Sequence, residues 1–333
     1  MIMCQHSECI IRLCGGSQMS WKCVREAAGW VAETRSGRQM FSNSFLRFVL
    51  VAVALMCLTA TYRATAGVIV IGDLHPYPQP NVSPGVEGIT FDYDRNPLVL
   101  DQWAWTLQRI DKTTAAVLSS VTSNPVTSFN EQLVFDPTTL AYFTRGYDDA
   151  TGDILIRIDP VAYNHATVGP LGTPLINFGG LAIDPAGNLW LGIDSSTEQL
   201  WTVDKGSGAA AFSRNITFPG GFQLHSMTIG SDGTFYAAAK ALAFNDGGEG
   251  IYRIDPNTGV ATFVTSTNPP ASNYALVSMT QDPATLQYYG IWSHFDFSDS
   301  AYKFQLVEVT GVPEPCGLWG LCVLLLQLRR RRQ

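Results

Sequence analysis

The chain has 333 residues, of which 46% are hydrophobic and 15% are charged, and its formal net charge is −7. This apolar fraction excludes a wholly disordered chain, and the many Gly, Thr and aromatic residues favour an all-β fold over a helical bundle. Between residues 67 and 311 there are 24 Asp and Glu but 10 Lys and Arg. A body this acidic repels phosphate, so we expect no nucleic-acid partner.

Residues 1–39 hold four of the seven cysteines, at spacings that fit no zinc site. They show no hydrophobic periodicity, so we expect them to be unstructured. They are either a mis-annotated stretch upstream of a true start at Met40 or an extended leader. Between Cys57 and Cys316 there is no cysteine, which excludes disulfides and thiolate metal sites from the body.

The segment 40–66 has the three parts of a secretory signal peptide: a basic start, a short apolar centre and small residues before a cleavage point. We expect the apolar centre to form a helix. The small residues Ala64 and Ala66 place the cleavage after Ala66, so that Gly67 becomes the new N-terminus. The protein is therefore predicted to be exported, with signal peptidase as its first partner.

Residues 67–311 are built from a repeated unit. A first signature recurs with its last residues 44, 48, 46 and 52 positions apart. Its copies are Gly88-Ile-Thr-Phe-Asp92, Gln132-Leu-Val-Phe-Asp136, Gly180-Leu-Ala-Ile-Asp184, Ser226-Met-Thr-Ile-Gly230 and Ser278-Met-Thr-Gln-Asp282. Each copy is followed by a short aliphatic or aromatic strand.

A second signature falls between these copies and is followed by turn residues and a β-branched strand. Its copies are Leu107-Gln-Arg-Ile-Asp111, Leu155-Ile-Arg-Ile-Asp159, Leu200-Trp-Thr-Val-Asp204, Tyr252-Arg-Ile-Asp255 and, more weakly, Gln305-Leu-Val-Glu308. We expect each Asp to accept the backbone N–H groups of its own turn.

Four strands in each unit of about 48 residues predict a β-propeller of about five blades. The fifth unit lacks a fourth strand, and we expect Gly67–Gly72 to supply it and close the ring. A β-sandwich or a solenoid is the alternative. The Asp-Pro-x-x-Gly-x-Leu-Trp run from Asp184 to Trp190 resembles blades of NHL- and lyase-type propellers.

One calcium candidate stands out, because Asp92, Asp94 and Asn96 have the opening oxygen spacing of a calcium loop. Pro97 then stands where that loop needs glycine, which favours a plain β-turn. Calcium is the one cofactor that the sequence suggests, and a chain without a cofactor is the main expectation.

Other polar and aromatic residues recur at blade positions. Four histidines, which a propeller could gather on its axis, are His75, His165, His225 and His294. Three arginines, which we expect to form inter-blade salt bridges, are Arg109, Arg157 and Arg253. Four tryptophans, which we expect to be packed strand residues, are Trp103, Trp190, Trp201 and Trp292.

The C-terminus has three consecutive parts: Val312-Pro313-Glu314-Pro315, an apolar segment over 316–328, and Arg329-Arg330-Arg331-Arg332. The prolines make a stiff recognition element, and the arginine cluster holds its end of the segment inside the membrane. This arrangement resembles the PEP-CTERM sorting signal of exopolysaccharide-producing Gram-negative bacteria. The resemblance implies an exosortase-type processing enzyme as partner and transient anchoring in the inner membrane. The apolar segment, expected to be helical, spans roughly 20 Å against a bilayer core of about 30 Å.

Two functions remain open. The first is a non-enzymatic propeller, delivered to the cell surface or extracellular matrix, that binds polysaccharide or surface proteins through its loops. The second is an exported lyase or glycoside hydrolase whose carboxylates or histidines meet at the propeller axis. No hydrolase or metalloprotease motif appears in the sequence, which favours the first.

Overall fold

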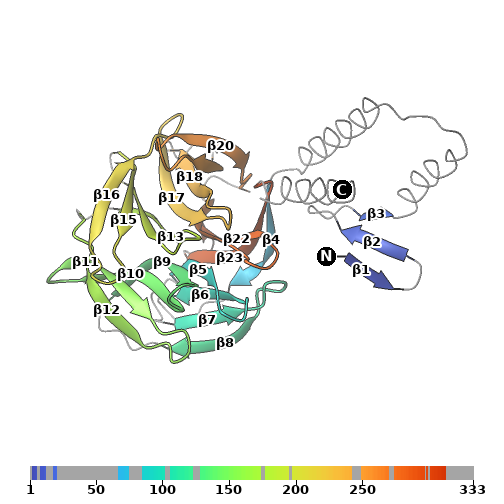
Figure 1. Cartoon of the computed structure of the whole chain (residues 1–333), viewed down its shortest axis with the longest axis horizontal. Helices are drawn as coiled ribbons and strands as arrows, with labels where there is room; N and C mark the ends of the chain where they lie inside the picture. Colours follow the sequence, from blue (N-terminus) through green and yellow to red (C-terminus); the bar gives the residue numbers. More distant parts are fainter. Residues whose placement is uncertain are drawn as a thin grey trace, which may run out of the picture. The chain divides into compact units, whose positions relative to one another are not determined.

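The computed structural model describes residues 2–5, 8–12, 18–20, 67–74, 85–101, 106–122, 128–173, 177–194, 197–241, 249–269, 274–296, 298 and 301–312. The chain divides into two compact units, Met1–Thr65 with Pro313–Gln333, and Ala66–Val312. Within the described residues all regular structure is β-strand, and no helix there could cross a membrane (Figure 1). The predicted signal helix and the tail beyond Val312 lie outside the described residues.

The second unit is a β-propeller of five blades, each a four-stranded antiparallel sheet (Figure 1). The first blade consists of β5 (Val86–Phe91), β6 (Pro97–Asp101), β7 (Thr106–Ile110) and β8 (Val117–Thr122). The second consists of β9 (Ser128–Asp136), β10 (Ala141–Asp148), β11 (Gly152–Ile158) and β12 (His165–Pro170). The third consists of β13 (Asn177–Ile183), β14 (Leu189–Asp194), β15 (Gln199–Val203) and β16 (Ala210–Asn215). The fourth consists of β17 (Phe222–Ile229), β18 (Phe235–Ala241), β19 (Gly250–Ile254) and β20 (Ala261–Ser266). The predicted fold class and blade number are confirmed.

The fifth blade closes the ring with a strand from the other end of the unit. It consists of β21 (Tyr274–Gln281), β22 (Tyr288–Asp296), β23 (Ala301–Thr310) and β4 (Gly67–Leu74). The pairing runs from Phe304 opposite Leu74 to Thr310 opposite Gly67, and the Thr310 hydroxyl donates to the Gly67 carbonyl at 2.9 Å. The predicted closure by the strand that starts at Gly67 is confirmed.

The first strand of each blade lies at the axis and contacts the first strands of its neighbours. Five blades leave little room there. A Cβ on Gly88 would lie 2.9 Å from the Leu133 nitrogen, and one on Gly180 would lie 2.5 Å from the Met227 nitrogen. Gly180 also has φ +127°, a conformation that L side chains rarely adopt. Glycine in the first signature therefore permits close approach of adjacent blades.

Apolar side chains fill the spaces between blades. One cluster joins the first two blades through Leu98 and Leu133, and another joins the fifth to the first through Ile291 and Ile89. Val312 is buried in the cluster between the fourth and fifth blades. The folded body thus extends into the first residue of the predicted sorting motif. Three of the four tryptophans are packed as expected, since Trp292 is buried, Trp190 packs on Phe235 and Trp201 on Phe212; Trp103 lies outside the described residues.

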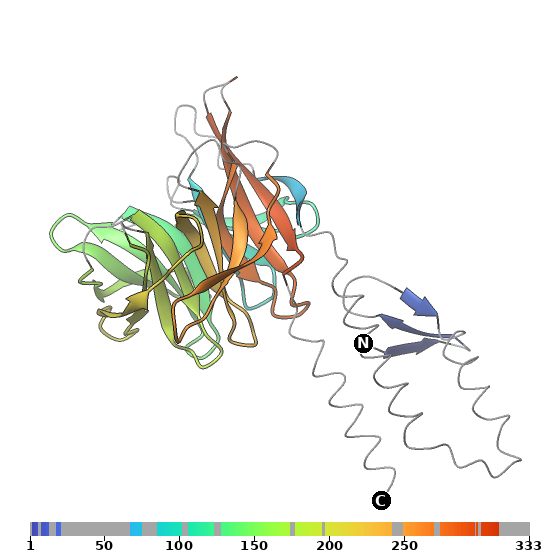
Figure 2. The ribbon, with the colours of Figure 1, turned by 90° about the horizontal axis from the view of Figure 1, so that it is seen from above.

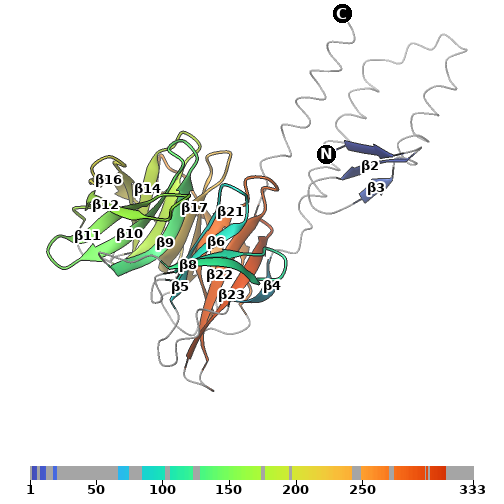
Figure 3. The same ribbon diagram turned by 90° about the horizontal axis from the view of Figure 1, so that it is seen from below.

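The strands of each blade run between two faces of the ring (Figures 2 and 3). One face carries the turns after the first and third strands, where the two signatures end, and we call it the signature-turn face. The other carries the turns after the second strands and the connections between blades, and we call it the opposite face. Because β23 ends and β4 begins at the paired residues Thr310 and Gly67, both ends of the propeller lie at the signature-turn face.

In the other unit, β1 (Ile2–Gln5), β2 (Glu8–Arg12) and β3 (Gln18–Ser20) form a three-stranded antiparallel sheet. This differs from the expectation that residues 1–39 lack regular structure. The physical reason is local composition, because the short apolar runs around Ile2 and Ile10 contain the β-branched residues that favour strands.

Candidate functional site

The aspartates of both signatures serve their own turns. Asp136 Oδ1 accepts the Thr138 backbone N–H at 2.9 Å, and Asp204 Oδ1 accepts that of Gly206 at 2.7 Å. The same contact recurs at Asp111, Asp159, Asp184, Asp255 and Asp282. The prediction that these carboxylates hold turns is confirmed, and it gives them a structural role.

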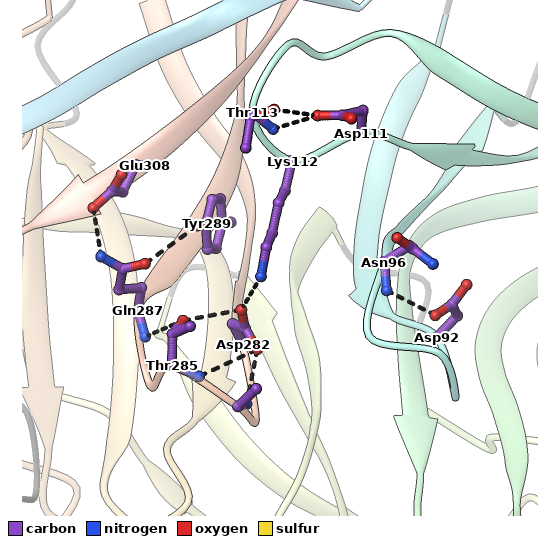
Figure 4. Close-up of polar contacts among 11 residues, drawn as sticks. Asp92, Asn96, Asp111, Lys112, Thr113, Asp282, Thr285, Gln287, Tyr289 and Glu308 are labelled. Atoms are coloured by element: carbon purple, nitrogen blue, oxygen red, sulfur yellow. Dashed lines mark hydrogen bonds and ion pairs between the residues drawn. The ribbon is translucent and has the colours of Figure 1, made fainter. Parts of the chain in front are cut away.

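Arg109 sits between the carboxylates of the calcium candidate. Its Nε lies 2.5 Å from Asp92 Oδ2 and its terminal nitrogen 3.4 Å from Asp94. Asp92 Oδ1 accepts the Asn96 backbone N–H at 2.8 Å (Figure 4). A calcium ion would have to displace this guanidinium. The expectation of inter-blade arginine bridges is wrong here, because strand register places Arg109 opposite Leu98, beside the turn of its own blade.

Lysines, rather than arginines, join the blades. Lys112 of the first blade lies 2.7 Å from Asp282 of the fifth (Figure 4). Lys205 of the third blade lies 2.5 Å from Asp136 of the second. Each lysine directly follows the last residue of a second signature and reaches the last residue of the preceding blade's first signature. In the described part of the chain, Arg157 and Arg253 are exposed and form no ion pair.

The environment of Asp136 shows the strength of one such pair. Burial alone would raise the pKa of this carboxyl, but Lys205 and the Thr138 and Thr139 hydroxyls outweigh burial and lower the pKa to about 2. The Asp282 pKa is lowered for the same reasons, with Lys112 as the cation. Both pairs therefore stabilise the ring, and neither is available for chemistry.

The histidines do not all converge. His165 lies on β12, the outermost strand of the second blade, and His75 is outside the described residues. His225 lies on β17, the axial strand of the fourth blade, and His294 on β22 of the fifth. His225 and His294 thus lie on adjacent blades, both toward the opposite face, and each has a neighbour close to Lys240: His225 is within electrostatic range of Lys240, and His294 stacks on Tyr274, whose carbonyl Lys240 binds.

Side chains around these two histidines form a polar and aromatic group that we call the Lys240 cluster. It comprises His225, Lys240, Glu249, Tyr274, His294 and Lys303. Lys240 Nζ donates to the Tyr274 carbonyl at 3.2 Å, and the Tyr274 and His294 rings stack at 4.1 Å with an interplanar angle of 14°. Tyr274 also meets Trp292 edge to face. On the far side of His294, Lys303 is its partner in the β22–β23 register.

Two acid–base groups of the cluster have shifted pKa values. Burial, reinforced by the positive charge of Lys240, lowers the pKa of His225 to about 4, so its imidazole is neutral at physiological pH. Burial raises the pKa of Glu249 to about 7, although its carboxyl accepts the Leu276 N–H at 2.5 Å and the Thr267 hydroxyl at 2.9 Å. Near neutral pH the two lysines outnumber the single, partly protonated carboxyl of the cluster, so its formal net charge is positive, in an acidic protein.

Sequence reasoning singled out the two histidines but missed the lysines, Tyr274 and Glu249. The available signal was Lys240 itself, a lone cation in the apolar run Tyr236-Ala-Ala-Ala-Lys240. Within the described residues, no group of three or more His, Cys, Asp or Glu could hold a metal ion.

No protein-family model matches the sequence, and no curated protein matches it. A GH43 β-1,3-galactosidase solved with galactodeoxynojirimycin is 10% identical, with a TM-score of 0.52 over 74% of this chain and 97% of that one. A gluconolactonase from Xanthomonas campestris is 13% identical, with a TM-score of 0.41 over 67% of this chain and 72% of that one. A protein of unknown function from Bacteroides thetaiotaomicron is 14% identical, with a TM-score of 0.45 over 72% of this chain and 64% of that one, so this chain spans under two thirds of its length. At these identities the similarity concerns the propeller fold alone.

Proposed function

We propose that this protein is an exported, surface- or matrix-associated binding propeller, delivered through its C-terminal PEP-CTERM-like signal. The observation that carries the binding role is the contrast between the carboxylates, which hold the structure together, and the Lys240 cluster, which is partly exposed. The signature-turn carboxylates hold turns and ion pairs, whereas the partly exposed Lys240 cluster combines cations with stacked rings. Such a combination suits recognition of a ligand, since few polar groups beside aromatic surface are typical of binding sites.

The placement of the chain ends supports this proposal. β4 begins directly after the proposed cleavage site, and β23 ends three residues before Pro313. Anchored through either end, the body would be held by its signature-turn face. The opposite face, which carries the Lys240 cluster, would then point away from the membrane.

The alternative of a glycoside hydrolase finds less support. Such an enzyme needs two carboxyl groups roughly 5–10 Å apart across an open mouth. Asp194 and Glu198 are neighbouring buried carboxyl groups, and burial raises the pKa of Asp194. They are hydrogen-bonded to each other, which leaves no room for a sugar between them.

Fractionation of cells that carry the processing enzyme tests the delivery signal. Wild-type protein should leave the inner membrane, whereas Glu314→Ala should be exported but retained there, because the recognised carboxylate is gone. Asp149→Ala, which removes an exposed carboxylate from the turn between β10 and β11, is the control and should behave as wild type. Identical partitioning of wild-type and Glu314→Ala proteins would refute the sorting function.

A further inference from the structure

We propose that the Lys240 cluster is a binding site for acidic polysaccharide, with the carboxylate of a uronic acid seated between Lys240 and Lys303 and the sugar ring against the Tyr274–His294 pair. The proposal rests on the binding function proposed above and specifies its ligand. It assigns a site to four strands of two adjacent blades, β18, β21, β22 and β23, at the opposite face.

The ring pair provides the platform. Tyr274 and His294 are half-buried and nearly parallel, and Trp292 braces Tyr274 from the buried side at 5.5 Å between ring centroids. The two rings are therefore fixed before any ligand arrives. Rings of this kind present an apolar face beside polar atoms, which matches the mixed surface of a pyranose. Preorganisation lowers the entropic cost of binding.

The charges select an anion. Lys240 lies on one side of the ring pair, fixed by its bond to the Tyr274 carbonyl, and Lys303 lies on the other, opposite His294. Two acidic groups face these lysines. Glu249 interacts with Lys240, but burial raises its pKa to about 7, so it carries only part of a negative charge near neutral pH. Asp296 interacts with Lys303 and His294 and also accepts the Ser298 N–H and hydroxyl, so a bound carboxylate would compete with Asp296 for Lys303. Charges beyond about 8 Å are screened at physiological ionic strength, so the ligand responds to these lysines more than to the acidic body as a whole.

His225 reports on the site. Its pKa is low because of burial and because Lys240 repels its protonated form. A carboxylate bound to Lys240 would offset that repulsion, and the pKa of His225 should rise. A neutral sugar stacked on the same rings would leave it unchanged. This response separates binding of an anion at Lys240 from non-specific attraction elsewhere.

The experiment uses processed protein purified from its host, an oligogalacturonate, and the methyl-esterified form of the same oligomer, which has no charge. We expect the acid to bind at least roughly tenfold more tightly than the ester, and the NMR-monitored pKa of His225 to rise with the acid alone. Lys240→Gln and Lys303→Gln should each remove most of this preference. Arg157→Gln, which deletes an exposed cation of the second blade, is the matched control and should bind as wild type.

Equal binding of acid and ester, or an unchanged His225 pKa in wild-type protein saturated with the acid, would overturn the proposal. Neither result depends on a variant that folds. Retention by cell-surface polysaccharide without oligogalacturonate binding would refute this ligand and leave the general binding function intact. Oligogalacturonate binding by a protein whose tail fails the Glu314→Ala test would refute the delivery signal and leave the site intact.

Discussion

The Lys205–Asp136 pair allows the contribution of one inter-blade contact to be worked out. Asp136 is fully buried, and its pKa falls from 3.8 to about 2. One pKa unit corresponds to about 1.4 kcal/mol, so the ionised carboxylate stabilises the fold by about 2 kcal/mol at neutral pH. Because the folded-state pKa is lowered, this stability is present above pH 3.8 and is lost as pH falls through about 2. Asp136→Asn should therefore cost about 2 kcal/mol at pH 7 and almost nothing near pH 2.

The assay is urea unfolding of wild-type and variant proteins across this pH range, monitored by tryptophan fluorescence. Asp184→Asn is the matched control, since Asp184 holds the same position in the third blade and its donors, Asn188, Trp190 and Ala186, are all neutral. Its substitution should cost less at pH 7. Equal costs for the two variants at pH 7, or a cost for Asp136→Asn that persists near pH 2, would refute the ion-pair reasoning.

Three further predictions concern closure, the axis and the buried acid. Deleting Gly67–Gly72 opens the ring and exposes the edge of β23, so we expect a large drop in Tm and aggregation by light scattering; an unchanged Tm would contradict closure. Gly180→Ala should cost about 2–4 kcal/mol in urea unfolding, because its Cβ would meet Met227, whereas Gly233→Ala, with φ +79° but open space, should cost about 1–2 kcal/mol. Burial raises the folded-state pKa of Glu249 to about 7, so the free energy of unfolding of wild-type protein should fall by about 3 kcal/mol between pH 4.5 and 8. Urea unfolding of Glu249→Gln should show no such fall. The same fall in the variant as in wild-type protein would count against the burial argument.

The fold was predictable because each repeat contains the same pattern of buried strand residues and turn residues. Each copy of the first signature supplies a buried axial strand and a turn aspartate, and the spacing of about 48 residues leaves room for four strands and no helix. Closure was predictable from one missing strand at the end and one surplus strand at Gly67. Each inference rested on neighbours in the sequence or on counting.

The contacts between blades were not predictable in the same way. Lys112 and Asp282 are 170 residues apart, and no local pattern links them. Arg109 seemed the better bridge because it recurs, yet strand register places it beside the turn of its own blade, where it meets Asp92, whereas the lysine after the signature reaches the preceding blade. The Lys240 cluster combines residues from five strands with Glu249, which directly precedes β19, and it belongs to no motif, so only the folded ring brings them together.

We propose that the opposite face holds the exported protein on surface polysaccharide. The most direct measurement compares tagged protein in two isogenic hosts, one that makes exopolysaccharide and one that does not, both with the processing enzyme. We expect cell-associated protein in the first host and release into the medium in the second, with Lys240→Gln released from both. The same distribution in both hosts would contradict it.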